Sequence, residues 1–438
     1  ELLNRFVSFY SNASYTSDDK YVLSGSIRWD RSNLWGTNSK YQNKPLWSVG
    51  GSWNIYKEKF FQADFVDMLK LRASYGIGGN IGRNTAPYLI ASYYDSSLVD
   101  GMAGSVNTPP NKDIRWEKTT TVNVGVDFAL FRHRLSGTIE YYNKYSVDLL
   151  AAINGSPTQG FGYTTLMTNN GKMVNRGVEI TLSGEIIRQK DFSWNASLLY
   201  AFNRNKVKHI SVQPSLWDSR ISMPTSYPMV GKPLYGIYAY KWAGLNENGD
   251  PQVYDAENNV TSGPARDYHA LVYCGTTVPI HNASLTNVLR YKGFEFSAML
   301  ILDAGHKLRS SNIPSINMSN GRITSTAKGI VDRWTQPGDV TDVPRLLFSN
   351  DTENFNTHRT ELYRYSDLFV YDASNIRLSN ISLAYRVPAH WCKKISLSGA
   401  RLQFNVENVA TFAFDSKANY DLGGKVKPNY VWGLYLNF

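Results

Sequence analysis

Apolar and polar residues alternate along residues 121–142, which read TVNVGVDFALFRHRLSGTIEYY. Val122, Val124 and Val126 begin a series of apolar residues at every second position, separated by polar or small residues. The alternation stops at FRHR and resumes in residues 135–142. A period of two residues places alternate side chains on opposite faces of a strand, so this segment predicts two strands joined by a hairpin turn. The apolar face of that hairpin must contact either protein or lipid.

The same alternation recurs along the whole chain. The further matching segments are residues 6–15, 21–30, 47–56, 69–77, 174–186, 192–202, 283–291, 294–300, 375–387, 398–406 and 429–438. Within residues 375–387 the pattern changes phase between Leu378 and Ile381, which predicts a β-bulge. Together with the first hairpin these segments predict about thirteen strands, each near the roughly ten residues that cross a bilayer at a tilt.

The connections between these strands alternate strictly between short and long. The short ones are residues 16–20, 57–67, 131–134, 188–191, 292–293 and 388–394, and the long ones are about 31–46, 78–116, 144–172, 204–280, 304–373 and 408–428. Outer-membrane barrels have this arrangement, with short periplasmic turns and long extracellular loops. A soluble sandwich or propeller shares the alternation of residues but rarely sorts its loops by length.

The last ten residues, NYVWGLYLNF, separate large apolar side chains onto one face. These side chains are Tyr430, Trp432, Leu434, Leu436 and Phe438. A soluble protein has little reason to expose a terminal Phe, whereas in a barrel this residue lies in the aromatic girdle at the membrane interface. The segment also resembles the terminal assembly signal of bacterial outer-membrane proteins. We therefore expect the apolar faces of the strands to contact lipid.

Composition agrees with a β-barrel and excludes other classes. Among 438 residues, 13% are aromatic, and no run of eighteen apolar residues provides a transmembrane helix. The net charge of +10 comes without a basic cluster or a nucleic-acid motif, so we interpret it as a surface bias towards anionic lipid headgroups. Cys274 and Cys392 are expected at opposite ends of the barrel, and we expect no disulfide between them.

No catalytic constellation is present, and we expect no enzyme activity and no cofactor. The seven histidines, at positions 133, 209, 269, 281, 306, 358 and 390, fall in turns, loops or strand ends. The glycine-rich stretch at residues 76–82 does not match the dinucleotide-binding pattern and no helix follows it. Asn246, Asn248, Asp250 and Glu257 have the spacing of calcium ligands, but Pro251 replaces the required glycine. We therefore predict a polar turn there and no metal site, with calcium as the weaker alternative.

Candidate ligand-binding residues lie in the long loops, where aromatic side chains occur near amides. They are Trp35, Tyr93, Tyr94, Trp116, Phe161, Tyr163, Trp217 and Trp334. Such residues suit sugar rings or peptide backbones, although packing within the loops explains them equally. A second set is predicted to face the lumen, where contact with a molecule inside the barrel is the alternative to pairing within a polar interior. It consists of Arg28, Arg72, Asp127, Glu140, Glu179 and Glu185.

Several longer motifs follow one another in a specific order. They are RWDRSNLWGTNSKYQNKPLWSVGGSWNI (28–55), LKLRASYGIGGNIG (69–82), PNKDIRWEKTTTVNVGVDFALFRHRLSGTIEYYNKYSVDLL (110–150), NNGKMVNRGVEITLSGEI (169–186), YGIYAYKWAGLNENGDPQVY (235–254) and SNIRLSNISLAYRVP (374–388). With the ending, they resemble the barrel domain of SusC-like TonB-dependent transporters of the Bacteroidetes outer membrane. The resemblance covers nearly the whole chain.

This resemblance implies an all-β fold, a transmembrane antiparallel barrel of 22 strands that encloses a plug. Residues 1–438 are then the C-terminal part of one barrel domain, with about thirteen strands and no plug. Counting back from a periplasmic C-terminus, an odd number of strands places Glu1 at the extracellular rim. We therefore expect a second polypeptide to supply the plug and roughly nine further strands, because open strand edges are not tolerated in a bilayer.

The resemblance also implies a function and partners. We expect TonB-dependent import of a glycan or peptide across the bacterial outer membrane, with a SusD-like surface lipoprotein as a lid and TonB acting through the plug chain. This chain would form the barrel wall and the external vestibule, with its long loops extracellular. A passive porin and a structural or adhesive outer-membrane protein remain the alternatives. The sequence does not distinguish a glycan from a peptide.

Overall fold

The computed structural model describes residues 5–33, 36–42, 44–80, 82, 87–97, 101–154, 158, 165–212, 219–263, 267–318, 326–348, 357–423 and 426–438. The chain divides into two compact units. Unit 1 consists of residues 1–213, 229–233 and 283–295, and unit 2 of residues 214–228, 234–282 and 296–438.

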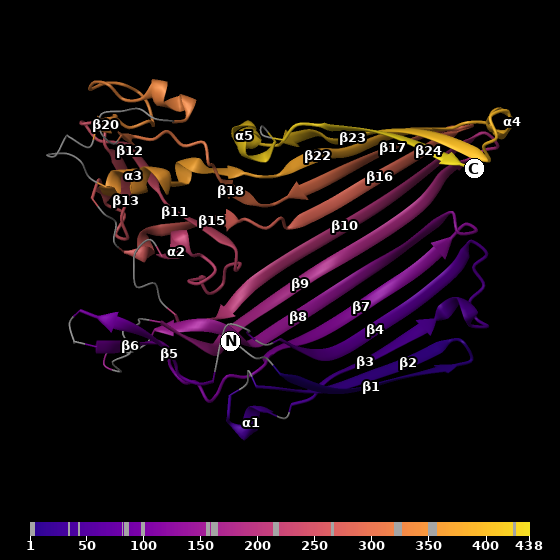
Figure 1. Cartoon of the computed structure of the whole chain (residues 1–438), viewed down its shortest axis with the longest axis horizontal. Helices are drawn as coiled ribbons and strands as arrows, with labels where there is room; N and C mark the ends of the chain where they lie inside the picture. Colours follow the sequence, from indigo (N-terminus) through magenta and orange to yellow (C-terminus); the bar gives the residue numbers. More distant parts are fainter. Residues whose placement is uncertain are drawn as a thin grey trace. The chain divides into compact units, whose positions relative to one another are not determined.

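Thirteen antiparallel strands form one large sheet (Figure 1). In sheet order they are β1 (Phe6–Ser17), β2 (Tyr21–Ser32), β3 (Leu46–Asn54), β4 (Val66–Asn80), β7 (Glu117–Leu130), β8 (Leu135–Asn154), β9 (Thr165–Arg188), β10 (Phe192–His209), β16 (His281–Tyr291), β17 (Phe294–Ala304), β22 (Asn375–Arg386), β23 (Gly399–Ala413) and β24 (Asn429–Asn437). Each of the thirteen predicted segments falls in one of these strands, so the predicted number of strands is confirmed.

The predicted irregularity in residues 375–387 is also confirmed. The pairing of β22 with β23 shifts register between Leu378 and Asn380. The expected loop at residues 144–172 is much shorter in the structure, because β8 continues to Asn154 and β9 begins at Thr165. The alternation of apolar residues weakens there, whereas backbone pairing of β8 with β9 continues. Backbone hydrogen bonds hold a hairpin together beyond the point where one face is apolar.

One face of the unit 1 sheet is apolar and uncovered by protein. Across the sheet, Leu71 pairs with Val126, Val126 with Ile139, and Ile139 with Ile180. Leu71, Ile139 and the neighbouring Val124 have exposed side chains. Leaving each such side chain in water forgoes about 1.5–3 kcal/mol of burial free energy, so a face of this kind needs an apolar environment.

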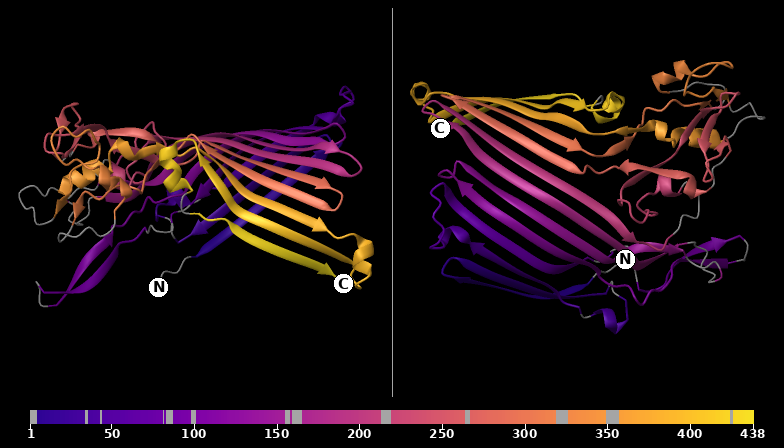
Figure 2. Two further views of the ribbon diagram at one scale, coloured as in Figure 1. Left: turned by 90° about the horizontal axis from the view of Figure 1, so that it is seen from above. Right: turned by 180° about the vertical axis from the view of Figure 1, so that it is seen from behind.

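Short connections join β1 to β2, β3 to β4, β7 to β8 and β9 to β10 at the same end of the unit 1 strands (Figures 1 and 2). In the first turn Asp18 and Asp19 have φ angles of 51° and 54°. Asp tolerates this left-handed conformation because its short side chain bonds to the nearby backbone. These four connections match the predicted short ones at residues 16–20, 57–67, 131–134 and 188–191, and a fifth, at residues 292–293, joins β16 to β17.

Aromatic side chains mark both borders of the apolar face. Near the turns, Phe65 stacks on Phe131 with ring centroids 5.9 Å apart. Towards the loop end, Phe9 lies 5.7 Å from Trp29. On β2, Tyr21 and Trp29 lie on the same face eight residues apart, or roughly 27 Å along a strand. At a tilt of about 40° this is roughly 20 Å across a bilayer, close to the apolar band of outer-membrane barrels.

The remaining elements of unit 1 are short. They are α1 (Ser39–Gln42), the 3₁₀ helix η1 (Ile55–Lys57), and the hairpin of β5 (Ile90–Ser96) with β6 (Gly101–Thr108). The β5–β6 hairpin extends beyond the loop ends of β4 and β7 (Figure 2).

The long connections of unit 2 fold into small sheets and helices. Its strands outside the large sheet are β11 (Gly236–Tyr240), β12 (Trp242–Leu245), β13 (Pro251–Tyr254), β14 (Val260–Thr261), β15 (Leu271–Thr276), β18 (Lys307–Arg309), β19 (Asn317–Met318), β20 (Leu347–Phe348) and β21 (Val370–Asp372). Its α-helices are α2 (Ser219–Ser222), α3 (Thr357–Arg364), α4 (Ala389–Lys393) and α5 (Asn419–Leu422), and its 3₁₀ helices are η3 (Tyr268–Ala270), η4 (Lys328–Asp332), η5 (Asp367–Phe369) and η6 (Ser416–Ala418). Ile316, Tyr363 and Phe369 form its buried apolar core.

In the described ranges, none of the helices has both the length and the hydrophobicity needed to cross a bilayer.

Candidate functional site

The face of the unit 1 sheet opposite the apolar one is polar and lined by small side chains. In one row across the sheet Ser24 pairs with Gly50, and Gly50 with Ser74. Ser26 and Ser48 share a hydrogen bond of 2.7 Å in the next row. A Cβ atom at Gly76 would lie 2.7 Å from the Cβ of Ser48, so only glycine fits there without movement. This part of the polar face is therefore lined by small side chains and is rich in hydroxyl groups.

A charged cluster occupies the same face where β4, β7 and β8 meet. The Arg72 Nε donates to both carboxylate oxygens of Asp127 at 3.1 Å, and its Nη2 donates to Glu140 at 2.7 Å. The Asn123 amide also donates to Glu140, and the Thr138 hydroxyl donates to Asp127 at 3.0 Å. The strand register places these groups together, because Arg72 lies opposite Gly125, and Gly125 opposite Glu140.

The cluster has an excess of negative charge. Glu179 of β9 lies opposite Glu140 and is exposed, and none of the ion pairs among the described residues includes it. Two cations, Arg72 and Lys70, therefore face three carboxylates, since Lys70 lies opposite Asp127 in the strand register. The two other predicted lumen residues form their own pairs, Arg28 with Asp30 at 2.8 Å and Glu185 with Arg188 at 3.4 Å.

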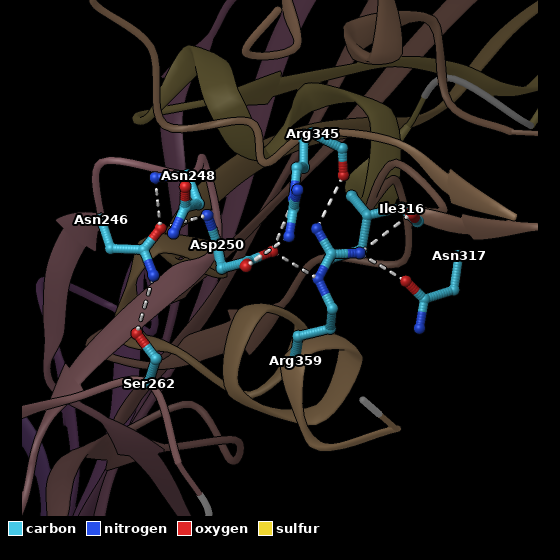
Figure 3. A network of polar contacts seen from close by, with 8 residues as sticks. All are labelled: Asn246, Asn248, Asp250, Ser262, Ile316, Asn317, Arg345 and Arg359. Carbon is cyan, nitrogen blue, oxygen red and sulfur yellow. Dashed lines mark hydrogen bonds and ion pairs between the residues drawn. The ribbon is translucent and has the colours of Figure 1, made fainter. Parts of the chain in front are cut away.

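A second polar network holds the loops of unit 2 together (Figure 3). The Asp250 carboxylate accepts two hydrogen bonds from Arg345, at 3.0 and 2.8 Å, and one from the Nε of Arg359 at 3.0 Å. Arg359 is only 2% exposed. Its other nitrogens donate to the carbonyl oxygens of Ile316 and Arg345 and to the side chain of Asn317. The network joins segments around residues 250, 317 and 345 through a buried arginine of α3 whose three nitrogens all donate hydrogen bonds.

The four residues with the spacing of calcium ligands, Asn246, Asn248, Asp250 and Glu257, make other contacts in the structure. The Asn246 side-chain oxygen accepts the backbone N–H groups of Asn248 and Asp250, both at 2.9 Å, which is the geometry of a polar turn. The Asp250 carboxylate binds Arg345 and Arg359. Glu257 lies in a separate turn, where its backbone N–H donates to the Asp255 side chain. Within the described residues, no three His, Cys, Asp or Glu side chains gather as metal ligands would.

The predicted aromatic residues fall in different surroundings. Tyr93 and Tyr94 project from β5 and are exposed. Trp116 covers Gly79, and Trp334 covers Gly249, since a Cβ atom at either glycine would meet the indole ring. For these two tryptophans the structure therefore shows packing contacts. Trp35, Phe161, Tyr163 and Trp217 lie outside the described residues.

Sequence reasoning did not single out Arg220, a buried cation of unit 2. Its guanidinium lies 4.8 Å from the ring centre of Tyr268 and 5.9 Å from that of Tyr238, and it donates to the carbonyl of Tyr227 at 3.4 Å. Burial lowers the pKa of Arg220. Residues 220, 238 and 268 share no motif, and only folding of the long connection brings them together.

Histidines and cysteines form no catalytic set in the described part of the chain. His269 pairs with Asp267 at 2.6 Å, and His358 with Glu361 at 3.2 Å. The ring of His306 is buried, its Nδ1 has no hydrogen-bond partner, and burial lowers its pKa. Cys274 and Cys392 are both free thiols.

The terminal segment forms the edge strand β24. The side chains of Tyr430, Trp432, Leu434, Leu436 and Phe438 are all exposed, and Trp432 lies 4.2 Å from Phe404 of β23.

The family described as TonB dependent receptor-like, beta-barrel matches residues 4–409. The chain belongs to this family. The family assignment and the thirteen-stranded sheet confirm the predicted transmembrane β-barrel fold. The resemblance to SusC-like transporters is confirmed by relatives that include a protein named SusC. In a barrel of this family the apolar face contacts lipid and the polar face lines the lumen.

Individual relatives share this region. TonB-dependent receptor P3 of Formosa agariphila is 26% identical, covering 98% of this chain and 43% of its own length. TonB-dependent receptor SusC of Bacteroides thetaiotaomicron is 25% identical, over 92% of this chain and 40% of its own. The structure of the RagAB peptide transporter has the same fold, with a TM-score of 0.80 and 23% identity over 99% of this chain and 48% of that one. The chain therefore spans less than half the length of these relatives.

Proposed function

We propose that this chain is part of an active importer that carries a glycan or a peptide across the bacterial outer membrane under the control of TonB. The observation that supports it is the pairing of a lipid-facing apolar surface with a polar wall that carries the Arg72, Asp127 and Glu140 cluster. A wall of small and hydroxyl side chains leaves room for a plug or a ligand, and the charged cluster offers it fixed polar partners.

In this proposal the long connections face the extracellular side and form the vestibule. Unit 2 supports this role, because its loops are held by buried networks such as that of Asp250, Arg345 and Arg359. Rigid loops can hold a ligand before transport, and exposed Tyr93 and Tyr94 offer aromatic surface for sugar rings or peptide groups. A SusD-like lipoprotein would cover this vestibule.

We further propose that strands outside these 438 residues pair with both edges of the sheet. β1 and β24 are the first and last strands in sheet order, so each has a strand neighbour on only one side among the described residues. Unpaired backbone groups at such an edge cost several kcal/mol each in the hydrocarbon of a bilayer. A second polypeptide that carries the remaining strands and the plug satisfies both edges and supplies the contact with TonB.

Transport is tested by uptake in the native host. We expect a deletion strain to lose uptake of its glycan or peptide, and a protonophore or loss of TonB to abolish uptake in the wild type. Uptake that persists without the proton gradient supports a passive porin and contradicts the proposal. Surface attachment that depends on this protein without any uptake supports an adhesive role.

The partners are tested by gentle extraction from the native outer membrane, followed by native and denaturing mass measurement. We expect a plug-bearing chain and a lipoprotein to accompany this polypeptide. A stable, folded monomer of the 438 residues alone contradicts the proposal of added strands.

A further inference from the structure

Basic residues gather on the lipid-facing side of the sheet near its loop end. We call this set the basic band; it consists of Lys118 on β7, Lys172 and Arg176 on β9, and Arg204 and Lys206 on β10. All five side chains are exposed. They share the face of the apolar residues. Val178 and Phe202 pair with each other across the sheet. Arg176 lies two positions from Val178, and Arg204 two positions from Phe202, so both arginines point to the same side as these apolar residues. The apolar surface therefore continues directly into positive charge.

Acidic residues of the same strands lie on the other face. Glu117, Asp127, Glu179 and Glu185 occupy odd-numbered positions of β7 and β9, whereas the basic residues of these strands occupy even-numbered ones. No ion pair among the described residues includes a member of the basic band. The separation of charge between the two faces leaves the cations of the band without an ion-pair partner among the residues that the structure describes.

Two members of the band directly oppose each other. Arg176 pairs with Arg204 in the register of β9 and β10. Like charges at directly opposite positions repel and destabilise a sheet. Arg176 donates its Nε to the Asn143 side chain at 3.0 Å, which holds the guanidinium in place without neutralising it. A counter-charge from outside the chain would remove the repulsion.

The depth of the band matches the headgroup region of a bilayer. On β10, Arg204 lies twelve positions beyond Phe192 at the turn end, or roughly 40 Å along the strand. A tilt of about 40° converts this to roughly 30 Å across the membrane, which is beyond the roughly 25 Å apolar band of outer-membrane barrels. The band therefore lies where the loop-side leaflet changes from acyl chains to headgroups.

We propose that the basic band binds the phosphate groups of anionic lipid headgroups in the loop-side leaflet. The two opposed arginines present planar donor groups to one phosphate, and the lysines add charge at its sides. The lipid tails lie against the apolar residues below. This binding is independent of the transported ligand and of energy coupling.

The test uses the intact outer-membrane protein in zwitterionic detergent micelles, titrated with phosphatidic acid and followed by native mass spectrometry. The double variant Arg176→Gln with Arg204→Gln removes two charges from the band. We expect about a 30-fold loss of affinity for phosphatidic acid, because each cation near the membrane surface contributes about 1 kcal/mol of attraction and the variant removes two. The matched control is Lys70→Gln with Lys144→Gln, which removes two cations from the polar face and leaves the affinity within about threefold.

Stability provides a second measurement, which separates lipid binding from a structural role. Without anionic lipid, the double arginine variant should unfold at the same temperature as the wild type or higher, because the repulsion is gone. With phosphatidic acid, the wild type should gain stability and the variant should not.

Equal affinity for phosphatidic acid in variant and wild type overturns the proposal, as does an equal loss of affinity in the control variant. Protection by inorganic phosphate at the same concentration also overturns it, since a free ion would then be the ligand.

Discussion

At the scale of single residues, polar side chains connect strands and turns that are distant in sequence. Glu58, in the turn after β3, accepts hydrogen bonds from Lys20 at 3.0 Å, from the Trp53 indole at 3.1 Å and from the Tyr21 hydroxyl. These donors lower the pKa of Glu58 from its ordinary 4.5 to about 2, with the Tyr21 bond as the largest cause. The contact joins the β1–β2 turn to the β3–β4 turn.

The lowered pKa predicts a pH dependence. A carboxylate whose pKa is lower in the folded state stabilises the fold above its unfolded pKa, and this contribution disappears as the pH falls towards about 2. We expect Glu58→Gln to be less stable than the wild type above pH 4.5, with the two proteins converging as the pH falls. Unfolding in detergent, followed by heat-modifiable gel mobility across this pH range, measures the difference. Asp64→Asn, in the same turn, is the control, and a stability gap that is independent of pH contradicts the assignment.

At the scale of elements, the membrane strands of the large sheet have one face for lipid and one for the lumen. Ile180 and Thr181 are neighbours on β9, and the register places Ile180 opposite Ile139 and Thr181 opposite Thr138. The alternation was readable from the sequence because it depends only on a period of two. The length of β8 and β9 beyond the membrane was not, because the pairing there depends on backbone hydrogen bonds rather than on an apolar face.

This alternation predicts unequal costs for the same substitution at adjacent positions. We expect Ile180→Arg to reduce barrel stability by about 2–4 kcal/mol, because it places a charge in the hydrocarbon, whereas Thr181→Arg faces the aqueous lumen and costs much less. Chemical unfolding of the two variants in lipid vesicles measures the difference. Equal destabilisation would show that these residues do not face different environments.

At the scale of the whole molecule, the two units depend on different interactions. The unit 1 sheet depends on strand pairing and on lipid, while unit 2 has its own buried core around Tyr363 and the network of Asp250, Arg345 and Arg359. Loss of the Asp250 charge would leave two guanidinium groups without their shared carboxylate. Removing one partner from a buried pair of this kind costs about 3–5 kcal/mol.

We therefore expect Asp250→Asn to loosen unit 2 without affecting unit 1. Hydrogen exchange should accelerate at the amides of α3 and β13, and stay unchanged in β7 and β8. Glu247→Gln removes an exposed carboxylate from the same turn and serves as the control. Faster exchange in β7 and β8 of unit 1 as well would contradict this prediction.

The sequence alone determined the thirteen strands, their two faces, the alternation of turns and loops, and the bulge near Leu378. All of these depend on neighbouring residues, because side-chain direction in a strand repeats every two positions. Only the tertiary structure decided which charges meet: Arg72 with Glu140, Asp250 with Arg359, and Arg176 opposite Arg204. Those contacts depend on strand register and on the packing of long loops. Register and packing are set by residues far apart in the chain, whose pairing no local pattern encodes.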